Sequence, residues 1–390
     1  MRSSKVQRVC AEHNKLLRKV KHVYTYSSEK FLSSINGNLL ITGSTKSKRE
    51  ELLVKAILHQ REVSAEPVII FSESRQFQER LISLAENDMI GELYVCSPEF
   101  RNYDFFCNMT TNQIVDYFTG LASLKGYRDT SELHDFAGSF IKILSTKAPV
   151  KLASINQFAM NNDTAISNVV GNMSVDYDII TGSTRGGISF RRLLGNAIET
   201  FGSLTTTACN TGFNISTAIN SDCVIFINTE AINYEFLSLY FLQELKSIVN
   251  RNFTVIFDDS ILLNNKELLE FVDIIKQKSN INVIVSYENI LTLPGADNTN
   301  FFKKKMILVN NASIPPDELQ KVLSEFGEYS HFESTTTMGT PPRLFFSFLK
   351  TESTAITPFS RGKVILEEVQ GCDAVLSGHN GAEILVVKRF

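Results

Sequence analysis

Short apolar runs that alternate with helical stretches constrain the fold of this chain most strongly. Within each run the apolar residues follow one another instead of alternating with polar ones, as in strands that are covered on both faces. The pattern predicts an α/β fold in which helices flank a mostly parallel central sheet. The runs are NLLIT (38–42), VIIF (68–71), ELYVC (92–96), CVIFINTE (223–230), FTVIFDDS (253–260) and NVIVSY (282–287).

Residues 104–170 interrupt this alternation. They hold three helical stretches, 110–124, 130–145 and 152–170, with no apolar strand between them. This arrangement predicts an inserted all-α subdomain. The tail adds strand-like runs at 303–311, 363–368, 374–378 and 383–390, whereas ESTTTMGTPP (333–342) predicts a loop. The expected parts are a basic N-terminal segment with the first part of the α/β domain (1–103), the helical subdomain (104–170) and the second part with C-terminal strands (171–390).

Composition excludes several classes of protein. The chain is 43% hydrophobic and 21% charged, as globular proteins are, and its net charge of -3 gives no global attraction to nucleic acid. Residues 1–30 are basic, which predicts a solvated helix face or, as the alternative, a surface for nucleic acid or acidic lipid.

Six scattered cysteines without a CxxC pair favour a reducing compartment. No apolar run approaches the ~20 residues of a membrane span. We therefore expect a cytoplasmic protein that reaches a membrane only through partners.

The segment ITGSTKSKRE (41–50) has the position of a nucleotide-binding loop but not its residues. A P-loop reads GxxxxGK[ST] between a strand and a helix, where backbone N–H groups, the lysine and the hydroxyl hold phosphates and Mg²⁺. Gly43 matches the first glycine, but Lys48, Arg49 and Glu50 replace the second glycine, the lysine and the hydroxyl. The candidate nucleotide-binding residues are Gly43, Ser44, Thr45, Lys46, Ser47, Lys48, Arg49 and Glu50.

Each replacement has a physical consequence. Lys48 carries a Cβ where the loop needs the backbone freedom of glycine. Arg49 keeps the positive charge but is longer and planar. Glu50 brings a carboxylate to the place where phosphates gather, so repulsion is expected. The loop predicts a degenerate Walker A site, and binding of ATP and Mg²⁺ is left open. The alternative is a plain strand-to-helix turn.

A second candidate is FTVIFDDS (253–260), an apolar strand that ends in acid like a Walker B motif. Asp258 would hold Mg²⁺ through water, and Asp259 would take the place of the carboxylate that activates water. Ser286 ends the next strand, where such motors often place a polar phosphate sensor. Many buried strands end in aspartate, so the motif alone is a weak signal. It is more specific here because it follows the candidate loop in the order that P-loop proteins show.

The segment STRGGISFRR (183–192) is basic and contains glycine. Arg185, Arg191 and Arg192 could act as an arginine finger toward a neighbouring subunit or contact nucleic acid. The alternative is a loop that leads into a helix with an exposed basic face. The six histidines show no metal-binding spacing, so no metal site is expected from them.

The colinear order of these features resembles the type IV secretion coupling proteins, the TraD/TraG-like DNA pumps of conjugation, which are hexameric P-loop ATPases related to the FtsK/HerA motors. The stretch VIFDDSILLNNKELLEFVDIIKQKSNINVIVSYENILTLPG is similar to that family's Walker B, helix, strand and sensor. Segments 325–336 and 359–386 look like its late motif and closing stretch. The resemblance implies a RecA-like P-loop NTPase fold. The inserted helices fall where the family carries the all-α domain that recognises the transferred cargo or its relaxase.

The expected function is that of a degenerate coupling-protein-like subunit, a pseudo-ATPase in a conjugative DNA-transfer or secretion assembly. One alternative is an active DNA-pumping ATPase that uses Arg49 in place of lysine together with Asp258 and Asp259. Another is a protein-cargo adaptor that acts through residues 104–170. The expected partners are proteins of the secretion or conjugation machinery, with DNA contact and homo- or hetero-oligomers left open.

Overall fold

The computed structural model describes residues 38–43, 45–128, 130–146, 150–160, 182–205, 212–230, 234–259, 278, 280–288, 302, 304–308, 328–338, 350–360, 374–378 and 384–387. The basic segment 1–30, Ser44 and part of the stretch expected to be helical at 152–170 lie outside these residues.

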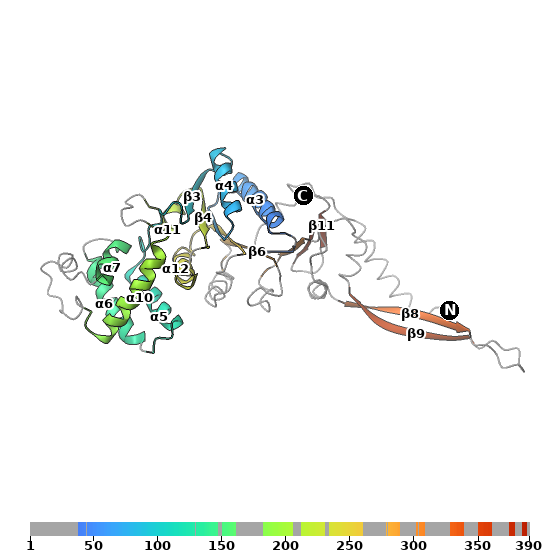
Figure 1. Cartoon of the computed structure of the whole chain (residues 1–390). Coiled ribbons are helices and arrows are strands. Elements are labelled where there is room, and N and C mark those ends of the chain that lie inside the picture. Colours follow the sequence, from blue (N-terminus) through green and yellow to red (C-terminus); the bar gives the residue numbers. More distant parts are fainter. Residues whose placement is uncertain are drawn as a thin grey trace, which may run out of the picture.

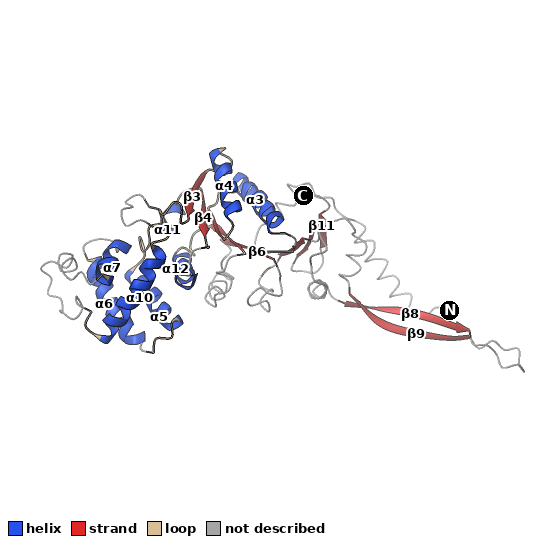
Figure 2. Cartoon of the chain, viewed as in Figure 1, coloured by secondary structure: helices blue, strands red, loops and turns tan. Residues whose placement is uncertain are grey.

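One sheet forms the centre of the molecule (Figures 1 and 2). Its order is β11-β10-β7-β1-β6-β5-β2-β4-β3. Every neighbouring pair from β7 to β3 is parallel, whereas β10 and β11 are antiparallel to their neighbours. The mostly parallel α/β architecture is therefore confirmed. The strands are β1 (Leu39–Thr42), β2 (Val68–Ser72), β3 (Glu92–Cys96), β4 (Cys223–Asn228), β5 (Phe253–Asp258), β6 (Ile281–Tyr287), β7 (Lys304–Leu308), β10 (Ala374–Gly378) and β11 (Ile384–Val387).

Helices cover both faces of this sheet, which explains the uninterrupted apolar runs. In β1, Leu39 and Ile41 contact one hydrophobic core, and Leu40 contacts the other. The first core contains the apolar side of α3 (Lys46–Val63) and α4 (Arg75–Glu86). The second contains α12 (Tyr234–Ser247) and the helical subdomain.

The helical subdomain is formed by α5 (Thr111–Leu124), α6 (Thr130–Ser145) and α7 (Leu152–Ala159), joined by α10 (Arg185–Phe201) (Figure 1). Helix α6 packs against α5, and α10 packs against both α6 and α7. Glycine at the start of α10 permits this approach. A Cβ atom on Gly186 would lie 2.3 Å from the carbonyl oxygen of Glu132 in α6.

The whole helical subdomain lies in sequence between β3 and β4, which are adjacent parallel strands. Glu92 is level with Cys223 and Cys96 is level with Ile227, so the two strands run side by side in the same direction. The helices, with the short α11 (Ile215–Ala218), therefore make up the crossover connection between these strands.

A buried polar network joins the crossover to the sheet layer. The Tyr103 hydroxyl donates to the Glu244 carboxylate, which also accepts the Ser216 N–H at 3.2 Å. Burial raises the pKa of Glu244 to about 7, although these hydrogen bonds oppose the rise. Phe105 and Phe106 pack in the same aromatic core and are 1% exposed.

Two further strands form a separate antiparallel hairpin, β8 (Glu328–Met338) with β9 (Lys350–Ser360). The prediction of a loop over 333–342 was therefore wrong for residues 333–338. The run of threonines there is β-branched, which favours an extended backbone. Among the helices that the structure describes, none has both the length and the apolar character needed to cross a membrane.

Candidate nucleotide-binding site

The central strands end in polar side chains at one edge of the sheet. Strand β6 lies between β1 and β5, and Ser286 of β6 is level with both Ile41 and Asp258. Ser72 at the end of β2 is level with Asp258 as well. The structure thus brings the Walker A, Walker B and sensor positions to one place, at the carboxyl ends of parallel strands where α/β proteins bind ligands.

The loop after β1 follows the expected strand-to-helix course. Gly43 has a φ of 85°, a left-handed conformation that suits glycine, and its N–H donates to the Glu288 carbonyl at 3.3 Å. Helix α3 begins at Lys46, inside the segment 41–50 that was compared with a P-loop. Lys46 is partly exposed and Lys48 is exposed.

Arg49, at the position of the P-loop lysine, points into the protein. Its side chain is 1% exposed and forms an ion pair with Asp259. Its Nη1 donates to the Gly43 carbonyl at 3.3 Å. The guanidinium therefore binds the loop backbone on one side and the Walker B segment on the other.

Asp259 is fixed by three contacts. Its backbone has a φ of 42°, which aspartate tolerates better than most residues. Its N–H donates to the Ser286 carbonyl at 2.9 Å, and its Oδ1 accepts the Glu288 N–H at 3.1 Å. Its Oδ2 is the atom paired with Arg49. Both carboxylate oxygens of Asp259 are thus engaged within the protein.

Asp258 is fully buried at the end of β5. The Ser72 hydroxyl donates to its Oδ2 at 2.9 Å. Burial raises the pKa of Asp258 to about 6, and the nearby carboxylates of Asp259 and Glu50 contribute to the rise, while the Ser286 and Ser72 hydroxyls oppose it. Ser286 is close enough to affect this pKa, although its hydroxyl forms no hydrogen bond of standard geometry with the described residues.

Glu50, at the position of the P-loop hydroxyl, is 4% exposed. Its Oε1 is buried without a hydrogen-bond partner among the described residues, as are Oδ1 of Asp258 and Oγ of Ser286. Such orphaned oxygens are costly unless a proton, water or cation satisfies them. In the described part of the chain, no group of three or more His, Cys, Asp or Glu side chains is placed to hold a metal ion.

The three candidate arginines lie on the helical subdomain. Helix α10 is well separated from β6 and α3 in Figure 1, so the chain itself does not bring them to the loop. Arg191 stacks on Phe158, with 4.4 Å between its Cζ and the ring centroid, and its Nε donates to the Phe158 carbonyl at 3.1 Å. Arg185 and Arg192 are exposed.

Sequence reasoning missed two residues of the site. Ser72 supports Asp258, and the Glu288 backbone holds both Gly43 and Asp259. The polar end of the apolar run VIIFS was the available signal for Ser72. No local pattern marks Glu288, because it acts through its backbone.

The sheet order, the loop between β1 and α3 and the acidic end of β5 define the class of fold, which is that of RecA-like P-loop ATPases. No family model matches the sequence, and no curated protein matches it. Solved structures do match.

VirB4 of Thermoanaerobacter pseudethanolicus is 12% identical, with a TM-score of 0.54 over 90% of this chain and 89% of that chain. The bacterial conjugative coupling protein TrwBdeltaN70 is 12% identical, with a TM-score of 0.51 over 90% of this chain and 83% of that chain. TrwB in complex with ADP and Mg²⁺ is 12% identical, with a TM-score of 0.52 over 90% of this chain and 84% of that chain. The expected resemblance to coupling proteins is confirmed as a likeness of fold.

Proposed function

We propose that this chain is a P-loop-fold subunit of a conjugative DNA-transfer or secretion assembly in which ATP hydrolysis has been lost or weakened. The likeness of fold to TrwB and VirB4 supports the kind of assembly. The ion pair between Arg49 and Asp259 supports the loss of catalysis and is the observation that carries the proposal.

Arg49 in this arrangement cannot serve as a phosphate ligand. A P-loop lysine extends toward the outer phosphates, whereas the Arg49 guanidinium is held by Gly43 and Asp259 inside the protein. The start of the loop is also held by the protein, since the Gly43 N–H donates to the Glu288 carbonyl. Binding of ATP would first have to break these contacts.

Asp259 is equally unsuited to activate water. A general base needs an oxygen available to the proton that it removes. Here Oδ1 accepts a backbone N–H and Oδ2 pairs with a guanidinium, so both oxygens are already engaged within the protein. The pair therefore acts as a brace between α3 and the ends of β5 and β6.

The charges of the side chains at this site also disfavour binding of Mg²⁺–ATP. The buried Glu50 carboxylate lies near enough to Asp258 to raise its pKa, so negative charge already accumulates there. Polyphosphate would add further negative charge next to Glu50. Arg49 is the cation in this group, and Asp259 already neutralises it.

The first test is a calorimetric titration of ATP with Mg²⁺ into the wild type and into a variant carrying Lys48→Gly, Arg49→Lys and Glu50→Ser. The wild type should show no micromolar binding that Asp258→Asn abolishes, and the restored variant should show such binding. Lys48→Gly alone is the matched control and should behave as the wild type. Micromolar binding by the wild type that Asp258→Asn abolishes would contradict the proposal, and such binding by neither protein would remove the support for the loop assignment.

An active motor is the main alternative. It predicts ATP turnover that DNA stimulates and that Asp258→Asn abolishes. The proposed subunit should show no turnover with or without DNA. Turnover that depends on Asp258 would establish the motor and overturn the proposal.

The proposal extends to partners. Proteins of a secretion or conjugation machinery are expected to bind this chain in a homo- or hetero-oligomer and to recruit it to a membrane from the cytoplasm. The cargo-adaptor alternative places the partner on the helical subdomain. Affinity purification from the host, followed by cross-linking, should map the contacts either to that subdomain or to the sheet.

A further inference from the structure

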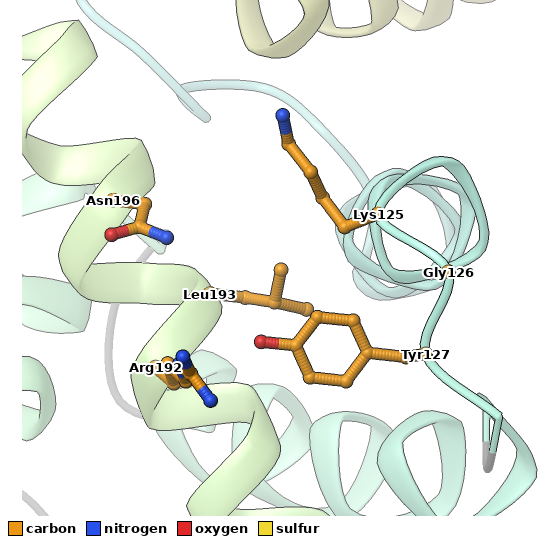
Figure 3. Close-up of a pocket in the computed structure, with 6 residues that line it drawn as sticks. All are labelled: Lys125, Gly126, Tyr127, Arg192, Leu193 and Asn196. Atoms are coloured by element: carbon orange, nitrogen blue, oxygen red, sulfur yellow. The ribbon is translucent and has the colours of Figure 1, made fainter.

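A pocket lies on the helical subdomain, apart from the candidate nucleotide loop (Figure 3). It has a volume of about 380 Å³, which lies within the range of small-ligand sites. It opens between the end of α5 and the exposed side of α10. The lining residues are Lys125, Gly126, Tyr127, Arg192, Leu193 and Asn196.

The end of α5 builds one wall. Gly126 has a φ of 73°, and its N–H donates to the Ser123 carbonyl, while the Tyr127 N–H donates to the Ala122 carbonyl at 3.0 Å. This left-handed helix ending turns the chain back toward α10. As a result the Tyr127 ring extends across the pocket, with its hydroxyl directed toward α10 (Figure 3).

Helix α10 builds the opposite wall. Arg192 and Asn196 are four residues apart, so they lie on one face of the helix, and both are exposed. The buried Leu193 forms the apolar floor between them. Figure 3 shows the Asn196 amide on the side of the pocket that faces Lys125.

The charge of the pocket is positive. Lys125 and Arg192 line it, and none of its lining residues is acidic. The Lys125 Nζ lies 5.1 Å from the centroid of the Phe236 ring, a cation–π contact. Two cations on opposite walls favour an anionic ligand.

We propose that this pocket binds a nucleoside phosphate. Lys125 and Arg192 would hold the phosphate, the Tyr127 ring would stack on the base, and the Asn196 amide would hydrogen-bond the base edge. An acidic peptide would use the two cations but not the aromatic wall and the amide together. The ligand is either a free nucleotide or one unit of a single-stranded nucleic acid. The proposal does not depend on the state of the nucleotide loop.

The test uses AMP and a fluorescein-labelled thymidine hexanucleotide as probes, with a hexaglutamate peptide as the charge control. We expect at least one nucleotide probe to bind the full-length protein and the peptide to bind much more weakly. Preference for AMP would identify a free nucleotide, and preference for the oligonucleotide would identify a single strand. Equal binding of the peptide, or binding of neither nucleotide probe, would overturn the proposal.

Variants locate the binding. Arg192→Gln and Lys125→Gln should each weaken binding about fivefold to tenfold, because each removes one charge-assisted hydrogen bond. The matched controls Arg80→Gln on α4 and Lys142→Gln on α6 change exposed cations outside the pocket and should leave affinity unchanged. Equal losses in the controls would indicate unspecific attraction and contradict the site.

Variants of Tyr127 test the contribution of ring stacking to ligand binding separately from that of charge. Tyr127→Phe keeps an aromatic ring and should retain affinity, whereas Tyr127→Leu should weaken it. The variant Lys48→Gly/Arg49→Lys/Glu50→Ser should bind AMP at this pocket as the wild type does. ATP binding that survives Arg192→Gln but fails in Asp258→Asn would instead belong to the nucleotide loop, so the two proposals fail in distinguishable ways.

Discussion

Arg49 and Asp259 form an ion pair across 210 residues of sequence, and the arginine side chain is almost completely buried while the aspartate is 20% exposed. The pair joins the first turn of α3 to the end of β5. It joins the residues at the predicted P-loop lysine and Walker B positions.

Removal of Arg49 should destabilise the protein. Arg49→Ala leaves the Asp259 carboxylate and the Gly43 carbonyl without their partner, and we expect a loss of about 2 to 3 kcal/mol in the free energy of unfolding. Denaturant unfolding measures this loss, and a double-mutant cycle with Asp259→Asn isolates the pair. The control is Lys55→Ala, which breaks the exposed pair with Glu51 and should cost less than about 0.5 kcal/mol. Equal costs for both variants would contradict a buried brace.

Ser72 should contribute to the stability of the fold through its hydrogen bond to Asp258. Ser72→Ala removes the donor to Oδ2 of a buried carboxyl group and the acceptor of the Ser74 N–H, which should cost about 1 to 3 kcal/mol. Ser139→Ala is the control, because its hydroxyl is exposed and bonds only to its own helix, and it should be nearly neutral. Both values come from urea unfolding. A neutral Ser72→Ala would show that Asp258 does not need this donor.

Glu244 should make stability depend on pH. Its folded-state pKa of about 7 lies above the ordinary value of 4.5, so the folded protein binds a proton more tightly than the unfolded chain. Stability should therefore fall as pH rises from about 4.5 to about 7, by an amount of the order of 3 kcal/mol. Glu244→Gln should remove this slope. Parallel unfolding curves for wild type and variant between pH 5 and pH 8 would refute the assignment.

Two glycines should respond in opposite directions. A Cβ on either Gly126 or Gly195 meets nothing within 4 Å, so only the backbone distinguishes them. Gly126→Ala places alanine at a φ of 73° and should cost about 1 kcal/mol. Gly195→Ala, inside α10, should add about 0.5 to 1 kcal/mol. Melting temperatures of the two variants check the signs, and shifts in the same direction would contradict this account.

Patterns in the sequence were sufficient for the central sheet. Uninterrupted apolar runs indicated strands covered on both faces, and the structure places Ser286 level with both Ile41 and Asp258. The direction of the Arg49 side chain could not be predicted, because it depends on a carboxylate that is distant in sequence. The β8–β9 hairpin was also missed, since polar threonine-rich strands carry no apolar signal.

The position of the helical subdomain between β3 and β4 limits how the chain can be shortened. The end of β3 and the start of β4 lie at opposite ends of this pair of adjacent parallel strands, since Cys96 is level with Ile227 rather than with Cys223. A tight turn cannot join them, and any shortened chain needs a connector of about a dozen residues or more. If the helical subdomain is deleted and the connector is too short, β3 and β4 cannot pair. Any loss of partner binding in such a variant would then result from damage to the sheet and not from the absence of the helices.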